Sequence, residues 1–392
     1  MNYDKLINRT LAEMKPSGIR KFFDIAAEME DVISLSVGEP DFATPWHIRQ
    51  EGIKTLEKGR TWYSPNAGLM ALRQAIGGYL SRRFDLTYDP KNEILVTVGG
   101  SEAIDLCFRA LLAPGDEVLI PEPSFVCYDP LTRMAGGVPI ALPTKAEDAF
   151  RLKAEVVKAA ITDKTKLLVL PFPNNPTGAI MPREELEELA EVLRGTDILV
   201  LSDEIYSELT YGREHVSIAS LPGMWERTLL VSGFSKAYAM TGWRLGYACG
   251  PKELMGPLTK LHQYGIMCAP TTAQYAAIEA MNNGDSDVTQ MRDEYDMRRR
   301  LIVDELNKMG LSCFEPEGAF YVFPSIQSTG MTSEEFCQRL LKEKHVAVVP
   351  GNAFGDSGEG FVRISYCYSL KHITEALRRI GEFLKENGLC SQ

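Results

Sequence analysis

The chain has 392 residues, of which 45% are hydrophobic and 24% are charged, ordinary values for a globular protein with a large core. Its 42 basic and 53 acidic residues give a net charge of −11, which argues against nucleic acid or an anionic membrane surface as the main partner. The 8 cysteines include no CxxC pair and no Cys/His spacing suited to zinc, so free thiols in a reducing cytoplasm are the simplest interpretation. No apolar run approaches the roughly 20 residues of a membrane span.

Residues 1–45 predict an N-terminal arm that forms part of a smaller domain. Within this arm, Ile19–Met29 has a pattern compatible with a helix, and Val32–Val37 is a short apolar run. Gly38–Phe42 then predicts a turn, because Gly, Pro and Asp favour turns. No linker or internal repeat separates the arm from the residues that follow.

Residues 46–284 predict a large α/β domain. A helix is expected over Pro182–Arg194, because its apolar residues fall at i, i+3, i+4 and i+7 between a starting proline and a following glycine. Alternation of such helices with strands indicates a mostly parallel, seven-stranded sheet sandwiched by helices. The seven apolar runs that predict the strands are Ile94–Val98, Glu117–Ile120, Val138–Leu142, Leu167–Leu170, Ile198–Leu201, Thr228–Val231 and Leu245–Cys249.

Residues 285–392 predict a smaller C-terminal α+β domain. A long charged helix runs through Arg298–Asn307, and a final helix places its apolar residues on one face before Gly388. Between these helices, short strands are expected at Phe320–Phe323, Val346–Val349 and Phe361–Ser365. The change of pattern near residue 285 therefore predicts a second domain after the large one.

The segment Ser232–Tyr247 carries the strongest chemical signal. Lys236 sits in a turn of small residues after the apolar run Thr228–Val231, and Arg244 follows eight residues later. A lysine at the end of a buried strand is costly unless it has a partner or a task. A covalent imine with an aldehyde cofactor is such a task, and a nearby arginine suits a phosphate. We therefore hypothesise that Lys236 carries pyridoxal phosphate.

A turn with two glycines precedes a predicted helix at Val98–Ala103. A helix N-terminus that a glycine turn approaches can bind phosphate. The same residues could instead begin a dinucleotide-binding motif, with Glu122 at about the spacing of an acidic ribose ligand, but the full GxGxxG is absent. Taken alone, an ordinary turn between strand and helix is the favoured interpretation.

Five further residues have a functional interpretation, and four of them have a structural one as well. Phe125 can stack on a cofactor ring or fill the core, and Asn175 can donate to a phenolate oxygen or complete an Asn-Pro turn. Asp203, at the carboxyl end of an apolar strand, can pair with a pyridine nitrogen or cap a helix, and Tyr206 can contact the ring oxygen O3′. Arg363 suits a substrate carboxylate or a solvated surface strand.

Together these motifs resemble the fold-type I pyridoxal-phosphate aminotransferases of class I/II, near the branch with aromatic and aspartate aminotransferases. The resemblance covers nearly the whole chain. The joint occurrence of these motifs favours the functional interpretation of each residue above. It rests on the order and spacing of the segments SGIRKFFDIA, SVGEPDFATP, YSPNAGL, PNNPTG, SDEIY, SGFSKAYAMTGWRLGY, EGAFYVFP, PGNAFG and FVRISY.

The resemblance implies which residues hold the cofactor ring and perform the chemistry. Lys236 forms the internal aldimine with pyridoxal 5′-phosphate and, once released, moves a proton between the substrate α-carbon and C4′ of the cofactor. Asp203 pairs with the pyridine nitrogen. Tyr206 and Asn175 hold O3′, and Phe125 stacks on the ring.

The resemblance also implies a phosphate site at the start of the helix that follows the glycine turn. The backbone of Gly100, Ser101 and Glu102 receives the phosphate there. Ser235 and Arg244 assist it from the lysine segment. These residues complete the implied cofactor site within one chain.

The substrate site and a homodimer follow from the same resemblance. Arg363 binds the substrate α-carboxylate, and the Gly38 backbone closes over it, with Asn175 also among the substrate contacts. Tyr63 reaches the phosphate of the neighbouring subunit, which implies a homodimer with shared sites.

The implied reaction is amino-group transfer between an amino acid and a 2-oxo acid such as 2-oxoglutarate. Relatives specific for aspartate can carry a lysine at the position of Ser101, so serine here favours an aromatic or broad specificity. Ile19, near the entrance, suits an apolar side chain. An aspartate or alanine aminotransferase, a β-lyase acting on cystathionine-like substrates, and a ligand-sensing regulator remain alternatives, although a regulator would need a DNA-binding module for which the chain leaves no room.

Overall fold

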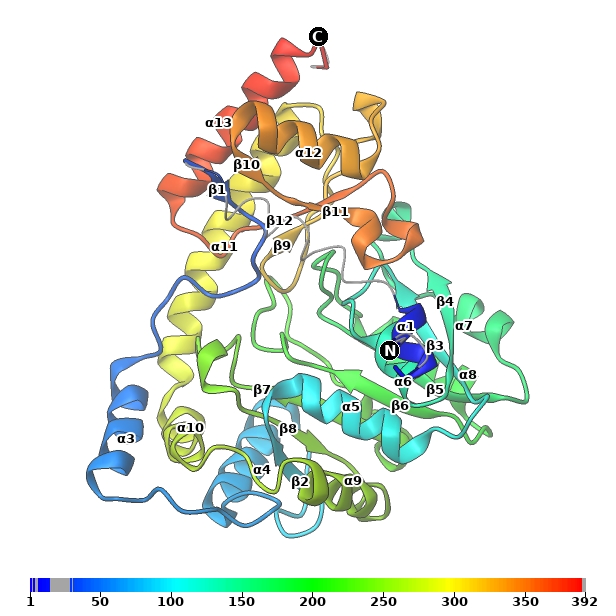
Figure 1. The fold of residues 1–392 in the computed structure, drawn as a ribbon, viewed down its shortest axis with the longest axis vertical. Coiled ribbons are helices and arrows are strands. Elements are labelled where there is room, and N and C mark those ends of the chain that lie inside the picture. Colours follow the sequence, from blue (N-terminus) through cyan, green and yellow to red (C-terminus); the bar gives the residue numbers. More distant parts are fainter. Residues whose placement is uncertain (2, 4–5, 15–28, 30, 390–392) are drawn as a thin grey trace.

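A computed structural model describes residues 1, 3, 6–14, 29 and 31–389 (Figure 1). The described residues form one large sheet between helices and a second group of short strands with its own helices. The helix expected over Ile19–Met29 lies outside the described residues except for Met29. The order of the remaining elements can be compared directly with the pattern that the sequence predicts.

The first half of the chain alternates between helices and strands. Up to residue 193 its elements are α1 (Arg9–Glu13), β1 (Ile33–Ser34), α3 (Trp46–Glu57), α4 (Met70–Phe84), β2 (Ile94–Thr97), α5 (Gly99–Leu111), β3 (Glu117–Glu122), α6 (Tyr128–Met134), β4 (Val138–Pro143), α7 (Ala154–Ala160), β5 (Thr165–Leu170) and α8 (Arg183–Leu193).

The second half completes the large sheet and then changes character. Its elements are β6 (Leu199–Asp203), β7 (Thr228–Gly233), β8 (Gly246–Cys249), α9 (Lys252–Gly265), α10 (Thr271–Asn283), α11 (Asp285–Lys308), β9 (Tyr321–Val322), α12 (Ser333–Lys344), β10 (Val346–Ala347), β11 (Val349–Pro350), β12 (Val362–Ser365) and α13 (Leu370–Glu386).

The seven predicted strands all join one sheet, in the order β2-β8-β7-β6-β5-β3-β4. The pairs within β4, β3, β5, β6 and β7 are parallel, whereas β8 runs antiparallel to both of its neighbours. The prediction of a mostly parallel sheet is therefore confirmed. Parallel strands end at a common edge, so residues that follow them in sequence are brought together there.

Helices cover both faces of this sheet, as Figure 1 shows. Along β6, Val200 packs in one hydrophobic cluster and Leu201 in another, because successive side chains of a strand point to opposite faces. The same alternation occurs along β5, where Leu168 and Val169 belong to these two clusters. The near-continuous apolar strands of the sequence thus reflect burial on both sides.

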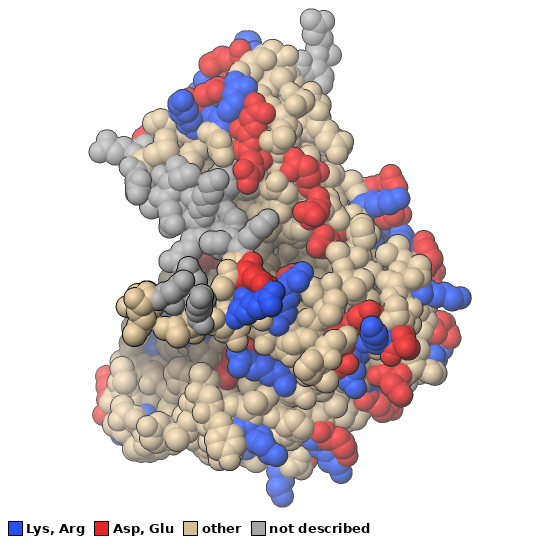
Figure 2. Space-filling model, turned by 45° about the vertical axis from the view of Figure 1, so that its right-hand side comes forward, with Lys and Arg blue, Asp and Glu red and all other residues tan. Residues whose placement is uncertain are grey.

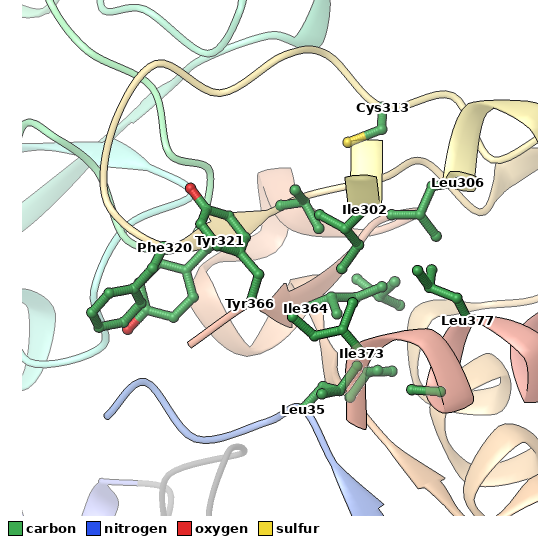
Figure 3. Packing of buried hydrophobic residues seen from close by; sticks show 14 of the residues in the cluster. Leu35, Ile302, Leu306, Cys313, Phe320, Tyr321, Ile364, Tyr366, Ile373 and Leu377 are labelled. Atoms are coloured by element: carbon green, nitrogen blue, oxygen red, sulfur yellow. The ribbon is translucent and has the colours of Figure 1, made fainter. Parts of the chain in front are cut away.

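A second group of elements surrounds the hydrophobic cluster drawn in Figure 3. It contains a three-stranded sheet in the order β11-β12-β9 and the two-stranded pair β1-β10. The parallel pairing of Ile33 with Val346 attaches the N-terminal segment to C-terminal residues. The domain limits at residues 45/46 and 284/285 stay a prediction.

The surface charges and the lengths of the helices describe the exterior of the molecule. On the face shown in Figure 2, acidic and basic side chains are interspersed rather than gathered by sign. Among the helices of the described residues, none is long and apolar enough to cross a membrane. The edge of the large sheet where the parallel strands end brings together residues that are far apart in the sequence.

Candidate functional site

A cavity of about 400 Å³ lies at this edge, between the large sheet and the smaller group of strands. Its lining comes from segments far apart in the sequence, which the ends of β3, β5, β6 and β7 bring together. The predicted site residues that line it are Gly38, Gly100, Ser101, Phe125, Asn175, Asp203, Tyr206, Ser235, Lys236, Arg244 and Arg363.

Three predicted site residues do not line this cavity. The Glu102 carboxylate turns away from it, accepting a hydrogen bond from the Val98 amide and lying 2.6 Å from His262 Nδ1. Tyr63 is 78% exposed, in the segment between α3 and α4. Ile19 lies outside the described residues. For Glu102 only the backbone amide, in the first turn of α5, remains a candidate contact.

Lys236 follows β7 and points its amine into the cavity. Its Nζ donates a hydrogen bond of 2.7 Å to the Gly38 carbonyl oxygen, so the arm and the large sheet meet at this amine. Burial lowers the pKa of Lys236 to about 8, because a charged amine is poorly solvated there. A lysine with this pKa has a substantial neutral fraction near neutrality and can act as a nucleophile or a base.

Asp203 is the last residue of β6, and its side chain is buried. Its Oδ2 accepts a 2.7 Å hydrogen bond from the Tyr128 hydroxyl, and its Oδ1 accepts one of 3.2 Å from the Ile205 amide. The second contact resembles the local capping that the sequence left open. Burial raises the pKa of Asp203 to about 6, against the opposing effect of the Tyr128 hydrogen bond. A cation placed against this carboxylate would therefore be stabilised strongly.

The start of α5 offers a site for an anion. Gly99 has φ +77°, and a Cβ built there would lie 2.6 Å from Arg244 Nη2, so the guanidinium lies against the helix N-terminus. Ser101 is exposed to the cavity in the same turn, and Ser235 lines it from the lysine segment. Free backbone amides beside a guanidinium are suited to a phosphate group. No carboxylate pairs with Arg244 among the described residues.

Arg363, on β12, is buried at the opposite side of the cavity. Its Nη1 donates to Asn175 Oδ1 at 2.9 Å, and its Nη2 donates to the Ser36 carbonyl oxygen. Its Nε is buried with no hydrogen-bond partner in the described part of the chain. A buried guanidinium with donors to spare is a natural site for a carboxylate, because the two groups match in charge and geometry.

Sequence reasoning missed two tyrosines of this cavity. Tyr128 holds Asp203, and the Tyr321 hydroxyl lies 2.9 Å from the Tyr206 hydroxyl. Tyr321 occurs within the quoted segment EGAFYVFP, and Tyr128 lies three residues after Phe125, yet only the tertiary structure places both in the cavity. A buried polar side chain must find a partner, and that rule is the one signal that could have suggested them.

The cavity is lined by cationic, anionic and aromatic groups. Among the described residues, no group of three or more His, Cys, Asp or Glu side chains is arranged to hold a metal ion. A reactive amine, a buried carboxylate, an anion site and a second guanidinium instead converge on one space. This combination can bind an organic molecule that carries an aldehyde, a basic ring nitrogen and a phosphate, next to a carboxylate.

Comparison with known proteins supports this chemistry. Residues 30–380 match the family model for aminotransferases of class I and II. The chain is 55% identical over 372 residues to the putative aminotransferase YugH of Bacillus subtilis, covering 95% of this chain and 96% of that protein.

Two solved structures are similar over nearly their whole length. The aromatic aminotransferase of Pyrococcus horikoshii is 46% identical, with a TM-score of 0.90 over 95% of this chain and 100% of that chain. The aspartate aminotransferase of Thermus thermophilus with maleate is 40% identical, with a TM-score of 0.92 over 96% and 99%. Relatives named for aromatic and for acidic amino acids are thus similar to this chain to about the same degree.

Proposed function

The chain belongs to the class I and II aminotransferases, which are pyridoxal-phosphate-dependent transaminases of fold type I, and on this premise we propose how its own residues carry the reaction. The enzyme transfers an amino group between an amino acid and a 2-oxo acid. We assign the covalent attachment of the cofactor to Lys236. The observation that carries this assignment is the buried Lys236 amine, whose pKa is lowered to about 8 at the centre of the cavity.

The residues present fit pyridoxal phosphate group by group. Asp203 offers a buried carboxylate with no cationic partner among the described residues, which suits a protonated ring nitrogen. The α5 N-terminus and Arg244 suit the phosphate, with Ser235 as a further donor. Phe125 lines the cavity and offers a ring for stacking.

The ring oxygen O3′ has two candidate donors. Arg363 holds the amide oxygen of Asn175, so the amide nitrogen is the group left to donate. Tyr206 supplies a phenol that burial keeps protonated, since its pKa is raised well above the ordinary value. Both donors stabilise negative charge on that oxygen.

The reaction needs a base that is next to the substrate and shielded from water. When bound, the cofactor supplies an electron-withdrawing ring that stabilises a carbanion at the substrate α-carbon. Asp203 would hold a proton on the ring nitrogen of the bound cofactor. The Lys236 amine, once free, would take the proton from the substrate α-carbon and deliver it to C4′ of the cofactor. The Gly38 carbonyl oxygen, 2.7 Å from Nζ, orients this amine.

Arg363 orients the substrate through its α-carboxylate. Its guanidinium lies between the rings of Tyr321 and Phe354, with Cζ 4.6 and 4.8 Å from the ring centroids. Its hydrogen bond to the Ser36 carbonyl ties it to the arm segment that contains Gly38. Binding of a carboxylate here therefore places the substrate amine near the lysine at little entropic cost.

We propose an aromatic or broad specificity for the side chain. The cations that line the cavity are Lys236, Arg244 and Arg363, and each already has a role in the reaction. No further cation among the described lining residues is left for a second substrate carboxylate. Ser101 occupies the place where an aspartate-specific relative can carry a lysine, and it is exposed to the cavity. An aspartate or alanine preference remains the second candidate.

We also propose a homodimer, in which Tyr63 serves the neighbouring site. Tyr63 and Trp62 are 78% and 62% exposed, and Tyr264 on α9 is 85% exposed. The Asn66 side chain donates to the Met267 carbonyl oxygen at 2.8 Å, so these two exposed segments lie side by side. A large apolar surface of this kind is typical of a subunit interface.

A cytoplasmic location is proposed on the basis of the seven described cysteines, all of which are free thiols. Fractionation of cells that express the protein would check this location, and recovery in an oxidising compartment would contradict it.

The first test separates a transaminase from a β-lyase. We expect the cofactor-loaded protein, mixed with phenylalanine and no 2-oxo acid, to form one 2-oxo acid per active site and then stop, since the amino group stays on the cofactor. A rapid-quench assay measures the amount of 2-oxo acid formed per active site. Cystathionine is tested in parallel, because a β-lyase would cleave it. Continued release of pyruvate and ammonia without an acceptor would establish the lyase instead.

The second test concerns specificity. We expect Ser101→Lys to raise kcat/KM for aspartate relative to phenylalanine by about tenfold, the effect of roughly 1.4 kcal/mol from a new charge-assisted contact. Ser101→Gln is the matched control, because it adds length without charge and should leave the ratio near that of the wild type. A wild-type protein that accepts only aspartate and glutamate in a donor screen would disprove the aromatic preference.

The third test asks whether Tyr63 acts across the interface. We expect the Lys236→Ala and Tyr63→Ala variants to be inactive or weak alone. In a hybrid dimer of the two variants, one site combines Lys236 of the Tyr63→Ala subunit with Tyr63 of the Lys236→Ala subunit. Random reassociation of equal amounts should restore about a quarter of the wild-type sites. Mixing without denaturation is the control. If Tyr63 acts within its own subunit, reassociation restores nothing.

A further inference from the structure

Tyr321 occupies a central position in the site without being assigned any part in the reaction. It lies on β9 and is 1% exposed, at the edge of the cluster in Figure 3. Ser365 of β12 is its partner across the strands, so Arg363 is its diagonal neighbour on the same face. The Tyr321 ring thereby meets the guanidinium, whose Cζ lies 4.6 Å from the ring centroid.

The hydroxyl of Tyr321 contacts Tyr206, the residue proposed to donate to the cofactor oxygen. It lies 2.9 Å from the Tyr206 hydroxyl, and these two phenols have no other hydrogen-bond partner in the described part of the chain. Their two protons therefore serve one bond between them, which leaves one proton free to point into the cavity. Which tyrosine keeps that free proton decides which of them can donate to a ligand.

Both phenols of this pair are buried, and Arg363 lies against the ring of Tyr321. Burial raises the pKa of Tyr321 to about 12, while the Arg363 cation and the hydrogen bond with Tyr206 act in the lowering direction. For Tyr206, burial raises the pKa well above its ordinary value, and Tyr321 raises it further, against the opposing effect of the Arg363 cation. Either hydroxyl can donate in this bond, and when Tyr321 donates, the Tyr206 proton stays available to a ligand.

The backbone around Tyr321 shows that its place is closely fitted. A Cβ built on Gly38 would lie 1.8 Å from the Tyr321 hydroxyl oxygen. The chain can pass over this hydroxyl, with the Gly38 carbonyl still within reach of Lys236, only because residue 38 has no side chain. Tyr321 thus touches the arm, Tyr206 and Arg363 at once.

We propose that Tyr321 is a positioning residue that couples the carboxylate-binding Arg363 to the donor Tyr206, an inference that rests on the proposed function. Its hydroxyl directs the Tyr206 proton toward the cofactor oxygen, and its ring holds the Arg363 guanidinium in the orientation that a carboxylate needs. The two effects come from different parts of one side chain, so different substitutions separate them.

Tyr321→Phe removes the hydroxyl and keeps the ring. A well-held donor to the ring oxygen favours the form in which that oxygen is negative, so losing it should raise the pH midpoint of the visible absorbance change of the loaded protein by about one unit. We expect kcat to fall about tenfold, while KM for the amino acid changes less than about threefold because the ring contact remains.

Tyr321→Leu removes the ring as well, so KM for the amino acid should rise about tenfold further as the guanidinium loses its aromatic contact. Tyr366→Phe is the matched control, because Tyr366 is a buried tyrosine of the same cluster whose hydroxyl donates to the Ala319 carbonyl at 3.1 Å. It should lower the melting temperature without shifting the absorbance midpoint.

The outcomes separate this inference from the proposed function. If Tyr206→Phe shifts the midpoint and Tyr321→Phe does not, the reaction assignment stands and the positioning role is wrong. An equal midpoint shift in Tyr366→Phe would also overturn the positioning role, since the effect would then reflect packing alone. If the wild-type protein shows no pH-dependent visible band when loaded, the proposed function itself fails.

Discussion

The contact between the Lys236 amine and the Gly38 carbonyl is the interaction on which the rest of the site depends. Lys236 belongs to the loop after the central strand β7, and Gly38 belongs to the N-terminal arm. Burial lowers the pKa of Lys236, yet the amine must remain accessible to a ligand. The apolar strand β7 buries the segment that leads to Lys236. The arm supplies the Gly38 carbonyl oxygen, which accepts a hydrogen bond from the amine where it faces the cavity.

The division of labour follows from where each group of elements lies. The carboxyl edge of the large sheet supplies Asp203, Asn175 and the α5 N-terminus, which suit the fixed parts of a cofactor. The smaller group of strands supplies Arg363, which suits the α-carboxylate of the substrate, and Tyr321, whose ring contacts Arg363. The arm lies between the two and is bonded to both, because Ser36 accepts from Arg363 while Gly38 accepts from Lys236.

Sequence patterns predicted the fold well where burial dictates them. The seven strands and helix α8 were found because apolar residues at period two or 3.6 reflect a buried face. The order and spacing of the motifs identified eleven site residues that line one cavity of the structure. Tyr128 and Tyr321 escaped because their partners lie far away in the chain, at Asp203 and Tyr206. The Glu102 side chain likewise found His262, a contact that no local pattern indicates.

The most direct test of the account is to locate the covalent bond to the cofactor. The loaded protein is reduced with borohydride, digested and mapped by mass spectrometry, with Lys236→Ala as the control. We predict a stable adduct on Lys236 alone, and a loading rate that rises with pH through about 8, because the neutral amine is the nucleophile and its fraction grows as the pH passes its pKa. An adduct on another lysine with Lys236 unmodified, or equal labelling of Lys236→Ala, would contradict the account.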